Sequence, residues 1–174
     1  MRRRRPEKRK IVPDPVYSDL VVAKFVNNLM KDGKKSVAEK IFYDSLNLIS
    51  KKESTDSPLD IFKKALKNAA PVVEVKSKRI GGATYQVPID IPENRRMALA
   101  MRWIIESSRS RSGSAYYLRL ARELMDAYNS QGPAIKRKDD ISSIISSKKL
   151  RNEKITIRPI AGTRKRGKNA NIFA

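Results

Sequence analysis

The apolar residues of this chain change their spacing in one stretch, and this change limits the folds that the chain can adopt. Before residue 72 and after residue 91 they recur every three or four positions, as in amphipathic helices. Between these positions they alternate with polar residues, and Gly81-Gly82 interrupts the alternation. Two glycines supply the positive φ angles of a tight turn, so this stretch predicts a two-stranded β-hairpin. We therefore expect a mainly α-helical bundle of five to six helices with one inserted hairpin arm.

Amphipathic segments on both sides of the hairpin predict five helices and a shorter sixth one. Gly33 is expected to end the first helix, and Ser36-Val37-Ala38-Glu39 has the spelling of a capping box for the second. A basic loop is expected at residues 136–138, after which Asp139 could cap a short helix. The expected helices cover about residues 18–32, 36–52, 58–70, 92–111, 115–130 and 139–145.

Positive charge is concentrated at the two ends of the chain. Its 174 residues include 39 Lys and Arg against 18 Asp and Glu, which gives a formal net charge of +21. Residues 1–10 carry +6 of this charge and residues 148–174 carry +8. A polyanion is the expected partner of such a chain. The expected organisation is a basic N-terminal arm over 1–12, a helical domain over 13–140 with the hairpin at about 72–91, and a basic C-terminal extension over 141–174.

The composition excludes several classes of function. The chain has no His and no Cys, so it lacks imidazole and thiolate groups for catalysis or metal binding. It contains no phosphate-binding glycine motif and no apolar run of the roughly 18 residues that would span a membrane. The densest carboxylate pair, Asp139-Asp140, consists of neighbours that do not face each other on a helix. No catalytic residue, metal site, cofactor or membrane contact is therefore expected.

Several groups of basic residues are candidates for contacts with a nucleic acid. The run Arg2 to Arg5 could bind phosphates, act as a nuclear localisation patch or belong to a transit peptide, although nearby prolines disfavour the amphipathic helix of a transit peptide. Lys34-Lys35 lie at an expected helix N-terminus, which suits a phosphate, although a solvated turn would look the same. On the fourth expected helix, Arg95, Arg102 and Arg109 recur every seven residues and therefore share one face.

The hairpin carries the third candidate surface. Lys76, Lys78 and Arg79 stand just before the glycine tip, where a bulk-free backbone can approach RNA phosphates. The alternative is an ordinary exposed hairpin whose lysines prevent edge-to-edge strand pairing.

Three stretches of the chain resemble the family of ribosomal protein seven of the small subunit, in its bacterial and organellar form. They are the DGKKS turn at 32–36, the stretch VEVKSKRIGGATYQVP at 73–88 and the helix ALAMRWI at 98–104. The resemblance covers about residues 1–139. Beyond them the family continues with a last helix that residues 141–174 do not resemble.

This resemblance implies a structural role in translation rather than an enzymatic one. Family members bind the 3′ major domain of small-subunit rRNA, nucleate assembly of the head, and lie near exit-site tRNA, the mRNA exit channel, ribosomal protein eleven and other head proteins. The implied location is a cytoplasmic bacterial ribosome, or an organellar one. Gly81 and Gly82 would be the tRNA-proximal tip, and the implied rRNA-binding residues are Arg2, Arg3, Arg4, Arg5, Lys8, Arg9, Lys10, Lys34, Lys35, Lys76, Lys78, Arg79, Arg95, Arg96 and Arg102.

Two other functions remain open at this point. A free RNA-binding regulator or chaperone, which could repress its own mRNA, would be found mostly outside ribosomes. An RNA-processing enzyme would have to use carboxylates such as Asp139, because the chain has no His or Cys.

Overall fold

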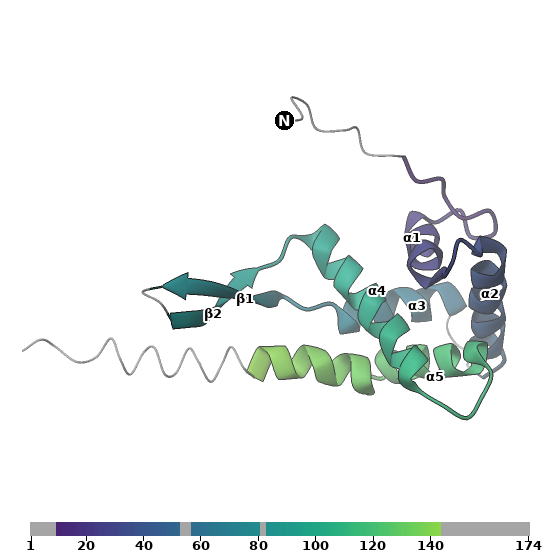
Figure 1. Ribbon diagram of the computed structural model, residues 1–174. Helices are drawn as coiled ribbons and strands as arrows, with labels where there is room; N and C mark the ends of the chain where they lie inside the picture. Colours follow the sequence, from purple (N-terminus) through teal and green to yellow (C-terminus); the bar gives the residue numbers. More distant parts are fainter. Residues whose placement is uncertain (1–9, 53–56, 81–82, 144–174) are drawn as a thin grey trace, which may run out of the picture.

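The computed structural model describes residues 10–52, 57–80 and 83–143 of the chain (Figure 1). These residues form a helical bundle from which one β-hairpin protrudes, so the expected mainly α fold with a hairpin arm is confirmed. The elements, in chain order, are α1 (Leu20–Leu29), α2 (Lys35–Lys52), α3 (Pro58–Ala69), β1 (Val73–Ile80), β2 (Ala83–Asp90), α4 (Glu93–Ser110), α5 (Tyr116–Tyr128) and a sixth helix over residues 133–143.

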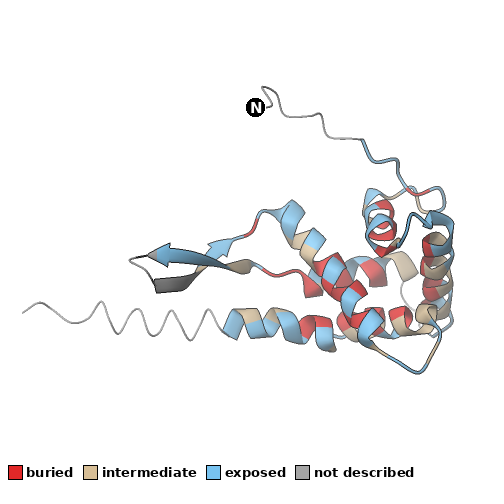
Figure 2. Cartoon of the chain, viewed as in Figure 1, coloured by how far each residue is buried: buried red, intermediate tan, exposed pale blue. Residues whose placement is uncertain are grey.

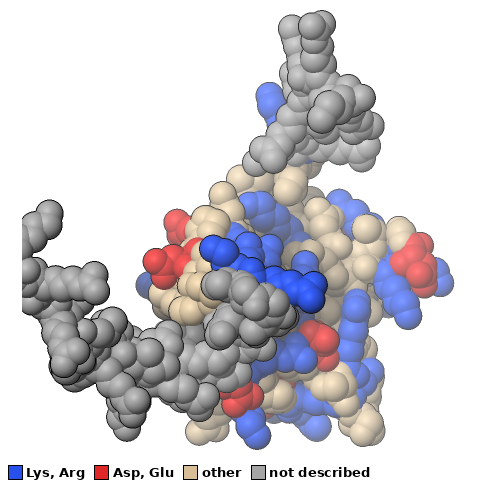
Figure 3. All heavy atoms as spheres, turned by 60° about the vertical axis from the view of Figure 1, so that its left-hand side comes forward, with Lys and Arg blue, Asp and Glu red and all other residues tan. Residues whose placement is uncertain are grey.

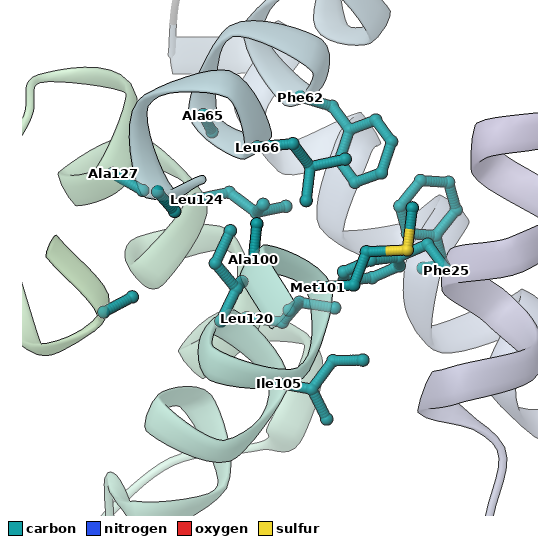
Figure 4. Packing of buried hydrophobic residues seen from close by; sticks show 14 of the residues in the cluster. Phe25, Phe62, Ala65, Leu66, Ala100, Met101, Ile105, Leu120, Leu124 and Ala127 are labelled. Carbon is teal, nitrogen blue, oxygen red and sulfur yellow. The ribbon is translucent and has the colours of Figure 1, made fainter. Parts of the chain in front are cut away.

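The hydrophobic core lies where the five labelled helices meet, and the hairpin stays outside it (Figure 2). Phe25, Phe42 and Phe62 contribute one aromatic ring each from α1, α2 and α3, and their ring centroids lie 5.1 to 5.4 Å apart. Leu124 of α5 and Met101 of α4 extend the same cluster toward the last helices (Figure 4). Every one of these side chains belongs to an expected apolar stripe, because residues three and four positions apart lie on one side of a helix.

The hairpin is antiparallel and regular over its whole length. Its register runs from Val73 opposite Asp90 to Ile80 opposite Ala83, with no residue skipped. Within the described part of the chain β1 pairs with β2 alone, in agreement with the expected hairpin arm. Pro88 of β2 has no N–H group to donate to a ladder, which suits a strand outside a wider sheet.

Two helix ends differ from the expectation at the turn between α1 and α2. The first helix ends at Leu29, because Met30 already has an extended backbone. Asp32 and Gly33 then both adopt positive φ angles, so Gly33 lies within the turn and does not cap the helix. The second helix begins at Lys35, whereas a capping box with Ser36 as the N-cap residue requires a start at Val37, two residues later. The capping-box prediction is therefore wrong.

The expected basic loop at residues 136–138 is also wrong, because these residues belong to the sixth helix. Pro133 stands at its first position, where the missing N–H group costs nothing. The buried carboxylate of Glu123 accepts a hydrogen bond of 3.3 Å from the next N–H group, that of Ala134. Ala134 and Ile135 are buried, so their packing anchors this helix to the bundle.

Gly132, which precedes this helix, is expected to tolerate no side chain. Its φ is +92°, and an added Cβ would lie 3.1 Å from the Cβ of Asp126, closer than ordinary contact. Gly113 is the matched control, because its φ is +89° but a Cβ there would meet nothing within 4 Å. Each Gly→Ala change should cost about 1–3 kcal/mol through backbone strain alone. Urea unfolding followed by circular dichroism should show a larger loss for Gly132→Ala, and equal losses would contradict this packing.

Candidate nucleic-acid interface

The hairpin presents cations on both of its faces. Lys76, Lys78 and Arg79 are exposed on β1, and none of them makes a hydrogen bond or ion pair with a described residue. Because successive side chains of a strand point to opposite faces, Lys76 and Lys78 share one face and Arg79 lies on the other. A protruding arm with charge on both faces can contact phosphates on either side. The glycine tip at residues 81–82 lies outside the described residues.

Two of the expected rRNA-binding arginines hold the base of the hairpin in this structure. Arg95 of α4 donates two hydrogen bonds, of 2.6 and 2.7 Å, to the carboxylate of Glu74 on β1. This contact lowers the pKa of Glu74 below its usual value. The neighbouring Arg96 donates a hydrogen bond of 3.0 Å to the carbonyl of Pro71. These two side chains therefore link α4 to the chain entering the hairpin, a role that their sequence positions did not indicate.

Arg102, about two turns further along the same face of α4 as Arg95, has no such partner among the described residues. It is exposed and makes no hydrogen bond or ion pair with a described residue. It lines a cleft of about 320 Å³ together with Asn28 of α1, Glu106 and Arg109. Glu106 forms an ion pair with Arg137 of the sixth helix, at 2.5 Å, and none with Arg102. The cleft thus contains one unpaired guanidinium next to a second one.

Asn28 and Arg109 also line this cleft, although neither is among the rRNA-binding residues that the family resemblance implies. Arg109 is indicated by the seven-residue repeat that it shares with Arg95 and Arg102. Its guanidinium donates a hydrogen bond of 3.1 Å to the carbonyl of Leu29, at the end of α1. Nothing in the sequence distinguishes Asn28 from other exposed helix residues.

The turn between α1 and α2 carries the next pair of candidates. Lys34 and Lys35 are exposed, as are the neighbouring Lys31 and Asp32. Lys35 lies 3.5 Å from Glu39 in an ion pair one turn apart on α2. Such an exposed pair is weak, so Lys35 can still exchange its partner for a phosphate.

The N-terminal arm leaves the bundle at a fixed point. Asp14 is buried and accepts hydrogen bonds from the N–H groups of Val16 and Tyr17 and, at 2.8 Å, from the hydroxyl of Tyr43 on α2. Burial and the bond to Asp14 raise the pKa of Tyr43, so this hydroxyl stays a donor. Lys10 is exposed; the other candidates of the arm, Arg2, Arg3, Arg4, Arg5, Lys8 and Arg9, lie outside the described residues.

Figure 3 views the molecule from the side of the hairpin. Lys and Arg side chains gather in the middle of this face, whereas Asp and Glu form smaller separate groups. Within the described residues, no group of three or more Asp and Glu is placed to hold a metal ion. No described helix is both long and apolar enough to cross a membrane.

The chain matches the family described as ribosomal protein S7p/S5e over residues 1–149. A small ribosomal subunit protein uS7 from Bdellovibrio bacteriovorus is 51% identical over 148 residues, which cover 85% of this chain and 94% of that relative. The uS7 protein of Petrotoga mobilis is 50% identical over 141 residues, covering 81% of this chain and 90% of the relative. The match extends beyond residue 139, where the sequence resemblance was expected to end.

The fold and the charged face define a small, strongly basic helical protein that extends a hairpin arm. The chain belongs to the ribosomal protein S7p/S5e family. It is a structural protein of the small ribosomal subunit with a role in translation, and it is not an enzyme. The expected family and the expected absence of catalysis are therefore confirmed.

Proposed function

We propose that this chain binds the 3′ major domain of small-subunit rRNA and nucleates assembly of the head around it. The observation that carries the proposal is a set of exposed cations that form no ion pair with a described residue. Lys76, Lys78 and Arg79 of the hairpin and Arg102 of α4 are the clearest of them. A folded protein gains nothing from unpaired like charges placed close together, whereas a polyanion releases counterions when such charges bind it.

The other parts of the proposal follow from the direction of the hairpin. It extends away from the bundle (Figure 1), so its tip at Gly81 and Gly82 can reach a partner that the bundle does not touch. We assign this tip to exit-site tRNA, near the mRNA exit channel. Ribosomal protein eleven and other head proteins would then contact the remaining surface, and the arms over 1–12 and 141–174 would add phosphate contacts beside the domain over 13–140.

The hairpin cations provide the test of this proposal. The triple variant Lys76→Ala, Lys78→Ala, Arg79→Ala should bind a 3′ major domain rRNA fragment more weakly than the unchanged chain. Each phosphate contact contributes about one unit to the slope of log K against log salt, so the slope should flatten by about three. Filter binding at several salt concentrations measures both quantities.

A matched control removes the same charge elsewhere. Lys40, Lys51 and Lys52 are exposed on α2, at the end of the bundle opposite the hairpin (Figure 1). Their triple change to Ala should leave the slope nearly unchanged. Equal slopes for the two triple variants would show that net charge alone, and not the hairpin, determines binding.

A further inference from the structure

An apolar groove runs beside the base of the hairpin. It has a volume of about 360 Å³, and its walls include Val73 and Val75 of β1, Leu99 and Trp103 of α4, and Ile141 of the sixth helix. Among the residues that line the groove, Glu74 carries a charge, and its carboxylate is already bound by Arg95 at 2.6 Å. A groove with apolar walls and no cation does not suit RNA, whereas it does suit an apolar segment of protein.

The sixth helix of the same chain leads to this groove. The sixth helix runs alongside the hairpin in Figure 1, and Ile141 in its last described turn already forms part of the groove wall. Residues three and four positions further along a helix lie on the same side, about one 5.4 Å turn onward. Those positions are Ile144 and Ile145. The sequence therefore continues the apolar stripe in the direction in which the groove continues, toward Val75 and Ser77.

We propose that residues 144–150 occupy this groove, with Ile144 and Ile145 packed between Val75 of the hairpin and Trp103 of α4. In the described part of the chain the hairpin is held at its base, by the Arg95 and Arg96 contacts and by the buried Ile91. The added contact would support β1 further out along the strand. The start of the C-terminal segment thus sets the direction in which the hairpin arm points, independently of any RNA.

Trp103 reports on this groove directly, because it is the one Trp of the chain. In the full chain without RNA, the variant Ile144→Ser, Ile145→Ser should shift the Trp103 emission to longer wavelength and increase its quenching by acrylamide. Both changes follow from the entry of water and quencher into the vacated groove. The matched control, Ile155→Ser with Ile157→Ser, removes the same apolar volume later in the same segment and should leave both signals unchanged.

A hairpin-side variant tests the same contact from its other wall. Val75→Ser alone should also increase quenching of Trp103, and it should add little to the effect of the double isoleucine variant, because residues in contact are not additive. Far-UV circular dichroism of each variant should match the unchanged chain. The proposal would be overturned if the Trp103 signals did not change in the Ile144→Ser, Ile145→Ser variant, or if they changed equally in the control variant. A dependence of these signals on protein concentration would also overturn it, because it would indicate a second molecule as the occupant.

Discussion

Replacing Phe62 with Ala should lower the free energy of unfolding by about 3–5 kcal/mol, the usual cost of truncating a buried aromatic ring. Phe62 is fully buried, and its ring packs edge-on against the rings of Phe25 and Phe42. The ring centroids are 5.1 Å apart for Phe25 and 5.2 Å apart for Phe42. The change removes one member of a three-ring cluster that joins α1, α2 and α3. The cavity cannot close easily, because the three helices that line it are fixed by their other contacts.

Urea unfolding followed by far-UV circular dichroism measures this loss. Leu20→Ala is the control, since Leu20 is 49% exposed and its truncation should change stability by only about 0.5 kcal/mol. Phe62→Leu keeps most of the volume and should retain most of the stability. A loss below about 1 kcal/mol for Phe62→Ala would mean that the aromatic cluster does not hold the bundle together.

Elements set by local sequence could be predicted well. The alternation over residues 73–91 and the glycine pair gave the hairpin, and the register from Val73 to Ile80 has no bulge that would shift it. The third helix begins at Pro58, as expected from the range 58–70, and a proline suits the first position of a helix. In each case the signal lies within a few residues of the element that it determines.

Elements set by distant contacts could not be predicted. At the start of the sixth helix the N–H of Ala134 donates a hydrogen bond to the side chain of Glu123, which lies eleven positions before Ala134 in the sequence. No local pattern shows such a partner. Arg95 and Arg96 illustrate the same limit within the candidate site, because their local sequence does not distinguish them from Arg102. The partners that distinguish them, Glu74 and the Pro71 carbonyl, lie more than twenty positions away in the sequence.

Arg111→Ala should destabilise the fold strongly. Arg111 follows α4, and its guanidinium contacts the carboxylates of Glu123 at 2.6 Å and Asp126 at 2.5 Å on α5. Glu123 is fully buried, so loss of Arg111 removes the cation that compensates its charge and leaves the N–H of Ala134 as a hydrogen-bond donor. We expect a loss of about 3 kcal/mol at pH 7.5, the lower end of the range for breaking a buried pair, since Arg111 is 27% exposed.

The exposed pair of Arg137 with Glu106 is the matched control. Its partners are 45% and 58% exposed, so Arg137→Ala should cost under about 1 kcal/mol. Urea unfolding of both variants measures the difference. Similar losses would show that the Arg111 contact is as well solvated as a surface pair.

Acid should reduce the damage caused by Arg111→Ala. Burial raises the pKa of Glu123 even in the presence of Arg111, whose contact acts in the opposite direction. Removing Arg111 should therefore raise this pKa further. A carboxyl whose pKa is higher in the folded than in the unfolded state binds a proton on folding, so its contribution to stability is complete below the unfolded pKa and is lost as pH rises through the folded pKa.

The gap in unfolding free energy between the unchanged chain and Arg111→Ala should accordingly narrow from pH 7.5 to pH 5. When Glu123→Gln is present in both chains, the group that titrates is absent, and the gap between the chains with and without Arg111→Ala should then stay constant over this range. It should also be smaller at pH 7.5, because a neutral amide costs less to bury than an unpaired carboxylate. A gap that narrows equally in both variants would assign the pH dependence to Asp126 or another carboxylate and not to Glu123.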